Sequence, residues 1–143
     1  MSSSCVFCAI NREPARAAQV FEDEHSIAFL DHRPLFPGHV LVVPREHHET
    51  LGDLPRHLLT PFFAAAQLLS RAVEKALDAD GTFLAINNKV SQSVPHLHMH
   101  VIPRRRKDGL RGFFWPRVGY ASAAHMEETA ERIREAVRLH PSS

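Results

Sequence analysis

The order of apolar and polar positions along the chain predicts short strands and two helices. Runs of β-branched and aromatic residues bounded by turn formers predict strands at residues 19–22, 26–30, 39–43, 82–87 and 96–102. Apolar residues at helical spacing predict a helix with Thr60 as N-cap, Pro61 in its first turn and Gly81 as its stop. A last helix is expected at residues 124–139, and residues 5–10 are expected to form only a short apolar turn. The pattern is typical of an α+β domain with helices over one sheet face.

Length and charge narrow the class of protein. A chain of 143 residues suits one domain spanning 1–143, with a core at residues 5–103 and a C-terminal loop and helix at 104–143. The net charge of +1 argues against broad binding to DNA or RNA. No apolar run approaches the ~20 residues of a membrane span, and the N-terminus lacks a secretory signal. We therefore expect a cytoplasmic protein with no membrane partner.

Three histidines alternate with apolar residues in the segment 96–102. Side chains of a strand point to opposite faces with period two, so His96, His98 and His100 are expected on one face, roughly 7 Å apart. A neutral imidazole, with a pKa of about 6.5, serves as a nucleophile or proton donor near neutral pH. The pattern therefore indicates a reactive strand. Imidazoles on one strand face also suit a catalytic zinc site, and a solvated sheet face carries histidines without chemistry.

The two cysteines form a Cys-x-x-Cys pair near the N-terminus. In a cytoplasmic chain, Cys5 and Cys8 indicate a metal half-site or a redox pair before a structural disulfide, although ordinary buried thiols are the alternative. Tetrahedral zinc requires two more donors. His47 is a candidate, and its neighbour His48 stays open as well, because adjacent strand positions point oppositely and the register is not fixed by sequence.

The string His-apolar-His-apolar-His-apolar-apolar at residues 96–102 resembles the signature of the histidine triad (HIT) proteins, which are nucleotide hydrolases and transferases. Further matching residues are Cys5, Val6, Phe7, Cys8, Phe29, Leu30, Asp31, Pro37, Gly38, His39, Val40, Asn87, Gln92, Ser93 and Val94. Because the third histidine is His100 rather than Gln, the chain looks more like the hydrolase branches than the uridylyltransferase branch. The resemblance implies an α+β HIT-like fold, with an antiparallel sheet of about five strands and two helices, extended across a homodimer.

The resemblance also implies catalytic roles. His98 would attack the α-phosphorus and form a covalent nucleotidyl-imidazole, from which water releases the nucleoside monophosphate. His100 and the amides near Ser93 would hold the non-bridging oxygens. Ser93 and Gln92 would lie near the bridging atom and the leaving group, and His39 would lie beside the triad.

The same resemblance implies a nucleotide-binding set. Asp31 would accept hydrogen bonds from the ribose hydroxyls. The base pocket would be lined by Val6, Phe7, Phe29 and His32, although core packing is the alternative for both phenylalanines. Either Asn87 or Asn88 would contact the nucleotide. The loop between Asn87 and Gln92 is shorter than in many relatives, and Ser91 stands where glycine is frequent. The phosphate contacts of this loop are therefore the part of the family pattern that this sequence matches least.

The resemblance also implies a metal site and a substrate class. In the zinc-bearing branches of the family, the metal is held by residues that correspond to Cys5, Cys8, His47 and His96 here. Because these four ligands fill the zinc coordination shell, the zinc would be structural. Candidate substrates are dinucleoside polyphosphates, nucleoside phosphoramidates and adenylyl conjugates, with purine bases. Two rival hypotheses are a metal-dependent hydrolase with the triad as zinc ligands and a non-catalytic nucleotide-binding module. The chemistry of two further clusters stays open: the basic residues Arg104, Arg105, Arg106 and Lys107, and the aromatic residues Phe113, Phe114 and Trp115.

Overall fold

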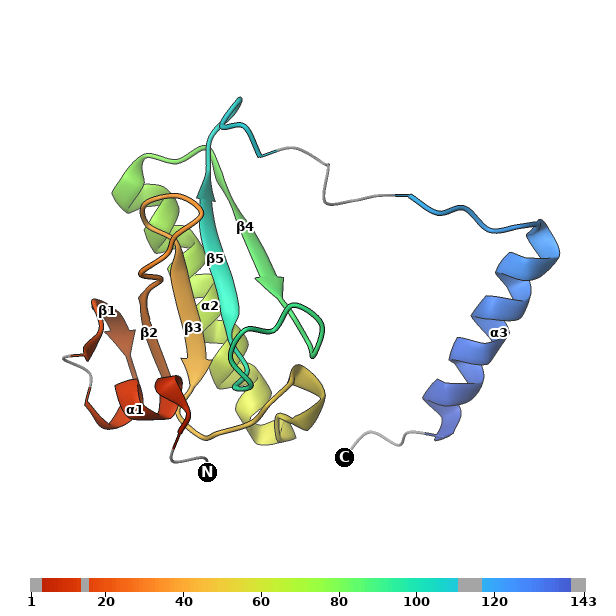
Figure 1. Cartoon of the computed structure of the whole chain (residues 1–143), viewed down its shortest axis with the longest axis horizontal. Coiled ribbons are helices and arrows are strands. Elements are labelled where there is room, and N and C mark those ends of the chain that lie inside the picture. Colours follow the sequence, from red (N-terminus) through yellow and green to blue (C-terminus); the bar gives the residue numbers. More distant parts are fainter. Residues whose placement is uncertain (1–3, 14–15, 111–116, 140–143) are drawn as a thin grey trace. The chain divides into compact units, whose positions relative to one another are not determined.

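One antiparallel sheet carries the fold of the computed structural model, which describes residues 4–13, 16–110 and 117–139. In the described chain the sheet has five strands in the order β1-β2-β3-β5-β4, and neighbouring strands are antiparallel (Figure 1). The strands are β1 (Gln19–Glu22), β2 (Ser26–Leu30), β3 (Val40–Pro44), β4 (Gly81–Ile86) and β5 (Met99–Arg104). The predicted α+β class is therefore confirmed.

The sheet is covered on both faces, so the expectation of helices over one face is wrong. Successive residues of β3 alternate between two core clusters: Val40 and Val42 pack under the long helix α2, while Leu41 and Val43 pack against the short helix α1 (Val6–Arg12). Burial of β3 on both faces explains its unbroken apolar run. Residues 6–10 thus form a helix instead of a turn, because Phe7, Cys8 and Ile10 can be buried together only on a helical face.

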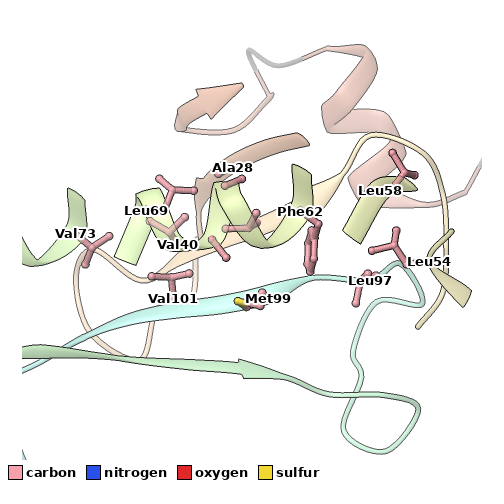
Figure 2. Packing of buried hydrophobic residues seen from close by; sticks show 13 residues of the cluster. Ala28, Val40, Leu54, Leu58, Phe62, Leu69, Val73, Leu97, Met99 and Val101 are labelled. Carbon is pink, nitrogen blue, oxygen red and sulfur yellow. The ribbon is translucent and has the colours of Figure 1, made fainter. Parts of the chain in front are cut away.

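Helix α2 (Arg56–Leu77) is longer than the sequence pattern predicted. Its N-cap is Pro55 instead of Thr60, so Pro61 lies inside the helix. The earlier start buries Leu58, which extends the apolar face of α2 by one turn. Leu58 belongs to the same buried cluster as Leu54 and Leu97 (Figure 2). The helix also ends before the predicted Gly81, at a left-handed Asp78 whose N–H bonds to the Glu74 carbonyl.

The chain divides into two compact units, Met1–Asp108 and Gly109–Ser143. The second unit contains α3 (Ala123–Leu139), which buries none of its described side chains and carries an ion-pair ladder along one face. The predicted aromatic cluster at Phe113, Phe114 and Trp115 lies outside the described residues. Within the residues described, helices are too short or too polar to cross a bilayer.

A 3-10 turn, η2 (Leu51–Asp53), joins β3 to α2.

Candidate active site and metal cluster

The triad begins outside the sheet. Strand β5 starts at Met99, so His96 and His98 precede the ladder, and the prediction of a strand from residue 96 is wrong at its start. The reason is that the Leu97 N–H bonds to the His48 carbonyl at 2.6 Å, which holds this stretch against a loop instead of a strand. The alternation of faces nevertheless persists: Leu97 and Met99 enter the core under α2, while the rings of His98 and His100 lie 5.1 Å apart on the other side.

His98 is held in one tautomer. Its Nδ1 lies 2.7 Å from the carbonyl oxygen of His96, and a carbonyl can only accept, so Nδ1 carries the proton. A neutral His98 therefore presents an unprotonated Nε2. The ring is buried, and the edge of Phe7 packs against it with the ring centroids 5.0 Å apart. This is the arrangement that a nucleophilic imidazole requires.

A chain of hydrogen bonds fixes the tautomer of His100 in the same way. The Leu35 N–H donates to Nδ1 of His39 at 3.0 Å, so the proton of a neutral His39 sits on Nε2. That N–H faces Nδ1 of His100 at 2.9 Å, which leaves His100 with its proton on Nε2. Burial lowers the pKa of His39 below its usual range and lowers the pKa of His100 to about 4. Both rings are therefore neutral at pH 7, and His100 is a hydrogen-bond donor on its free side.

Asp31, His39 and His100 also lie close enough together to suggest a metal site. The hydrogen bonds argue against one. A metal on Nε2 of His39 would require the proton on Nδ1, where the Leu35 N–H already points. The His39 Nε2 lies 3.7 Å from the nearer Asp31 oxygen, so the carboxylate supports the ring electrostatically. This cluster is a hydrogen-bonded support for His100.

A pocket of about 760 Å³ opens beside His98 and His100. Its lining contains the predicted nucleotide-binding residues Val6, Phe7, Phe29, Asp31 and His32, together with Ser93. A volume in this range and a mainly apolar wall suit a small-molecule site. The structure therefore brings the imidazoles of His98 and His100, the Asp31 carboxylate and an apolar wall together around one space.

Other predicted residues lie elsewhere. His39 stands behind His100, and the described lining of the pocket does not include Gln92, Asn87 or Asn88. The Gln92 side chain spans its own loop, donating to the Glu49 carbonyl at 2.5 Å and accepting from the Lys89 N–H at 2.8 Å. The Asn88 side chain accepts from the Leu51 N–H at 3.1 Å. Both side chains brace the loop in this structure.

The same loop contains two strained positions. Lys89 and Ser91 have φ values of 71° and 61°, in the left-handed region that glycine occupies without cost. This conformation explains why glycine is suited to the position of Ser91. The loop keeps the glycine-type backbone although it has a side chain there, and the hydrogen bonds of Gln92 and Asn88 stabilise it.

Sequence reasoning missed part of the pocket wall. The additional lining residues are Ile10, Arg16, Ala17, Ala18, Leu30, Leu41 and Val94. Helical spacing from Val6 and Phe7 is the signal that could have found Ile10, and alternation along β3 could have found Leu41. Residues 16–18 carry no comparable pattern, because they reach the pocket through the connection between α1 and β1.

Four side chains at the N-terminal end of α1 form a cluster suited to a metal. The ligand atoms of Cys5, Cys8, His47 and His96 all lie within 4.8 Å of one another. The Nδ1 of His96 lies 3.5 Å from the Cys5 sulfur and 3.6 Å from the Cys8 sulfur, and the Nδ1 of His47 lies 3.3 Å from the Cys8 sulfur. A tetrahedral zinc with Zn–S of about 2.3 Å and Zn–N of about 2.0–2.1 Å separates its S and N ligands by about 3.5 Å. These three distances therefore match the ligand spacing of a tetrahedral zinc site.

The surroundings of the cluster favour a bound cation. The Nε2 of His96 donates to the Pro44 carbonyl at 2.9 Å, which leaves Nδ1 unprotonated and turned toward the sulfurs. Burial lowers the pKa of His96 to about 4 and raises the pKa of the Cys8 thiol. A buried thiolate thus requires a positive partner. The structure also decides between the neighbouring histidines, because His48 lies against Glu46 at 3.4 Å instead of in the cluster.

The basic segment after β5 lies far from His98. Five strand residues, or about 17 Å, separate Met99 from Arg104. Arg104 pairs with Asp108 at 2.6 Å, the Arg106 N–H donates to Asp80, and Arg105 donates to the carbonyl of Leu77. These contacts tie the segment to the end of α2, which favours a structural role over attraction of a polyphosphate.

Comparison with known proteins agrees with this geometry. The model of the HIT domain matches residues 12–107. An uncharacterised HIT-like protein of Mycobacterium tuberculosis is 42% identical over 74% of this chain and 75% of its own length. An adenosine 5'-monophosphoramidase of Saccharomyces cerevisiae is 36% identical over 77% of this chain and 69% of its own. An adenylylsulfatase of Arabidopsis thaliana is 34% identical over 77% and 57%.

Two solved structures are similar in three dimensions. A HIT family member from Bacillus subtilis has a TM-score of 0.79 and 32% identity, and the match covers 99% of each chain. A zinc-bound histidine triad protein from Mycobacterium smegmatis has a TM-score of 0.70 and 42% identity over 76% of this chain and 80% of its own. With a matching domain model, a shared fold and relatives named for action on nucleotides, the chain belongs to the HIT family.

Proposed function

We propose that this protein is a nucleotidyl hydrolase or transferase that cleaves α-phosphate bonds of nucleotides through a covalent intermediate on His98. The observation that carries the proposal is the 2.7 Å contact between Nδ1 of His98 and the His96 carbonyl, since it leaves Nε2 free beside a nucleotide-sized pocket. Relatives that are named as a monophosphoramidase and an adenylylsulfatase support the reaction class. Candidate substrates are dinucleoside polyphosphates, nucleoside phosphoramidates and adenylyl conjugates.

The reaction then runs in two displacements. In the first, a bond forms between Nε2 of His98 and the α-phosphorus, while the bond from phosphorus to the bridging oxygen or nitrogen breaks and the leaving group takes up a proton from solvent. The positive charge that develops on the ring is stabilised by the His96 carbonyl at Nδ1. In the second, water attacks phosphorus and releases a proton to solvent, the bond between phosphorus and Nε2 breaks, and the nucleoside monophosphate leaves with His98 neutral again.

Other residues orient the substrate. His100 donates its Nε2–H to a non-bridging oxygen, because His39 occupies its Nδ1. Backbone amides near Ser93 hold the remaining oxygens, and Ser93 serves the leaving-group side, while Gln92 braces the loop that carries Ser93. Asp31 accepts the ribose hydroxyls. Val6, Phe7, Phe29 and His32 form the wall against a purine base.

The Cys5, Cys8, His47 and His96 cluster holds a structural zinc in this proposal. A full Cys₂His₂ shell leaves no coordination position for substrate or water, so the ion supplies a cross-link between α1 and the segment before β5. The two cysteines are not joined in a disulfide, so both sulfurs are available to the ion.

Rapid quenching with labelled substrate tests the nucleophile. The wild type should give an acid-labile phosphoramidate adduct on His98. The His98→Asn variant should retain nucleotide binding and lose turnover by several orders of magnitude. His57→Asn, at an exposed position on α2, is the matched control and should turn over normally. A label on Ser93, or equal turnover in both histidine variants, would refute the assignment.

The rival hypotheses give different results. A metal-dependent hydrolase should lose turnover reversibly on chelation while the fold stays intact. In the described part of the chain, the triad rings bond to separate partners instead of converging on one ion, which argues against that mechanism. A pure binding module should bind nucleotide with near-zero turnover in wild type and variant alike.

The homodimer is also part of the proposal. Strand β4 is an edge of the sheet, because it pairs only with β5 among the described strands. Phe63, Leu68 and Leu84 expose large apolar side chains. An open edge beside apolar surface is suited to sheet extension by a second copy. A monomeric mass in light scattering at micromolar concentration would count against it.

A further inference from the structure

His96 belongs to both sites at once. Its ring lies in the Cys₂His₂ cluster through Nδ1, and its Nε2 is tied to the Pro44 carbonyl. Its own backbone carbonyl receives the Nδ1 proton of His98 at 2.7 Å. Only Leu97 therefore lies between a candidate metal ligand and the candidate nucleophile, and a single carbonyl group connects them.

A second contact fixes the same stretch of backbone. The Leu97 N–H donates to the His48 carbonyl at 2.6 Å, and His48 directly follows the ligand His47. The loop after β3 thus holds residues 96 and 97 twice, once through the cluster and once through a backbone hydrogen bond. These two contacts, with the bond from the His96 N–H to the Val94 carbonyl at 2.8 Å, set the position of the His96 carbonyl, since β5 begins only at Met99.

We propose that the metal cluster positions the nucleophile: with its four ligands bound together, it fixes the His96 carbonyl that selects the reacting tautomer of His98. This inference rests on the proposed function of His98. When the cluster is open, the His96 ring is held only through Pro44, and His47 no longer anchors the loop whose His48 carbonyl holds the Leu97 N–H. The His96 carbonyl then shifts and the Nδ1 proton loses its fixed acceptor. The reacting nitrogen is then protonated or misaligned in part of the molecules.

The expected consequence is a loss in kcat instead of in binding. A misplacement of about 1 Å at a reacting group costs up to about a hundredfold in rate. The pocket wall should persist, because α1 is also held by the packing of Phe7 and Ile10 against Ile27, Phe29 and Leu41. A cluster with a merely structural role would instead change the free energy of unfolding and leave kcat of the folded protein unchanged.

His47 offers the cleanest variants, because it lies outside the pocket lining. His47→Ala removes one ligand, whereas His47→Cys offers a Cys₃His set that also binds zinc. Leu69→Ala is the control: it lowers stability through a cavity under α2, in the other core cluster. Each variant is measured for zinc content, kcat and KM, and for the NMR resonances of the His98 side chain without substrate, at a temperature where all are folded.

The proposal expects His47→Ala to lose zinc, the His98 Nδ1–H resonance and about tenfold or more in kcat, while KM changes by less than about threefold. His47→Cys should recover all three with zinc bound, and Leu69→Ala should change none of them. Unchanged kcat in folded, zinc-free His47→Ala overturns the proposal, and so does an equal loss in Leu69→Ala. If His47→Ala does not fold, chelator-stripped wild type replaces it. If even the wild type shows no turnover, the proposed function fails, and the His98 resonance alone decides the positioning.

Discussion

His100 links the site to the stability of the fold, and replacing it with Gln tests the link. Burial, and the neighbouring His98 and His39, lower its pKa to about 4, while Asp31 acts in the opposite direction. The ordinary value is 6.5, so below that pH the unfolded chain binds a proton that the folded chain excludes. Stability from this residue is therefore present above pH 6.5 and is lost as the pH falls from 6.5 toward 4.

The magnitude follows from the shift. A difference of 2.5 between 6.5 and 4 corresponds to at most about 3 kcal/mol of unfolding free energy when the whole range is crossed. Between pH 7.5 and 5.5 the loss is about 1 kcal/mol, which urea denaturation resolves. The His100→Gln variant should lose this part of the pH dependence.

The slope of unfolding free energy against pH, compared among three proteins, separates the effect of His100 from that of the metal cluster. Wild type, His100→Gln and His57→Gln are unfolded in urea at several pH values, with zinc in excess. His57 is exposed on α2, so its variant should follow the wild-type slope. If His100→Gln also follows it, the residue titrates normally in the folded state, and the buried neutral donor invoked for phosphate binding is refuted.

Two further predictions concern Asp31 and Gly38. The Asp31→Asn variant keeps the acceptor for the Arg33 N–H at 2.9 Å but removes the negative charge. Its kcat/KM should therefore fall about ten- to a hundredfold, with little change in stability. The control Asp23→Asn, in a similar turn outside the pocket, should leave kcat/KM unchanged. Gly38→Ala should lower the unfolding free energy by about 2 kcal/mol or more, because φ is +97° and a Cβ would meet Leu77. The control Gly52→Ala should change the unfolding free energy by less than about 1 kcal/mol. Equal urea midpoints for the two alanine variants would contradict this prediction.

Periodicity predicted the strands well because it is a local property. Apolar runs placed β2 and β3 within a few residues, and the alternation at residues 96–101 placed the histidines opposite the core residues. Pro61 misled the prediction of the helix start, since propensity favours proline in the first turn. The burial of Leu58 by tertiary packing outweighed this local preference.

The ligand set could be predicted only in part. The spacing of Cys5 and Cys8 identifies a half-site, but it does not choose between His47 and His48, whose side chains differ in direction. That choice depends on contacts with residues 39 positions away along the chain. Arg16 and the neighbouring alanines in the pocket wall carried no local signal at all.

The sequence by itself determined which residues alternate, which are reactive and which family the pattern resembles, because these follow from neighbours within a few positions. The tertiary structure alone decided which nitrogen of each histidine carries its proton. Those protons are set by the Pro44 and His96 carbonyls, the Leu35 N–H and the His39 ring, groups whose approach depends on sheet register and loop path. The chemistry of each imidazole depends on these partners. The site could therefore be described only from the folded structure, in which residues as far apart as Cys5 and His96, 91 positions along the chain, are in contact.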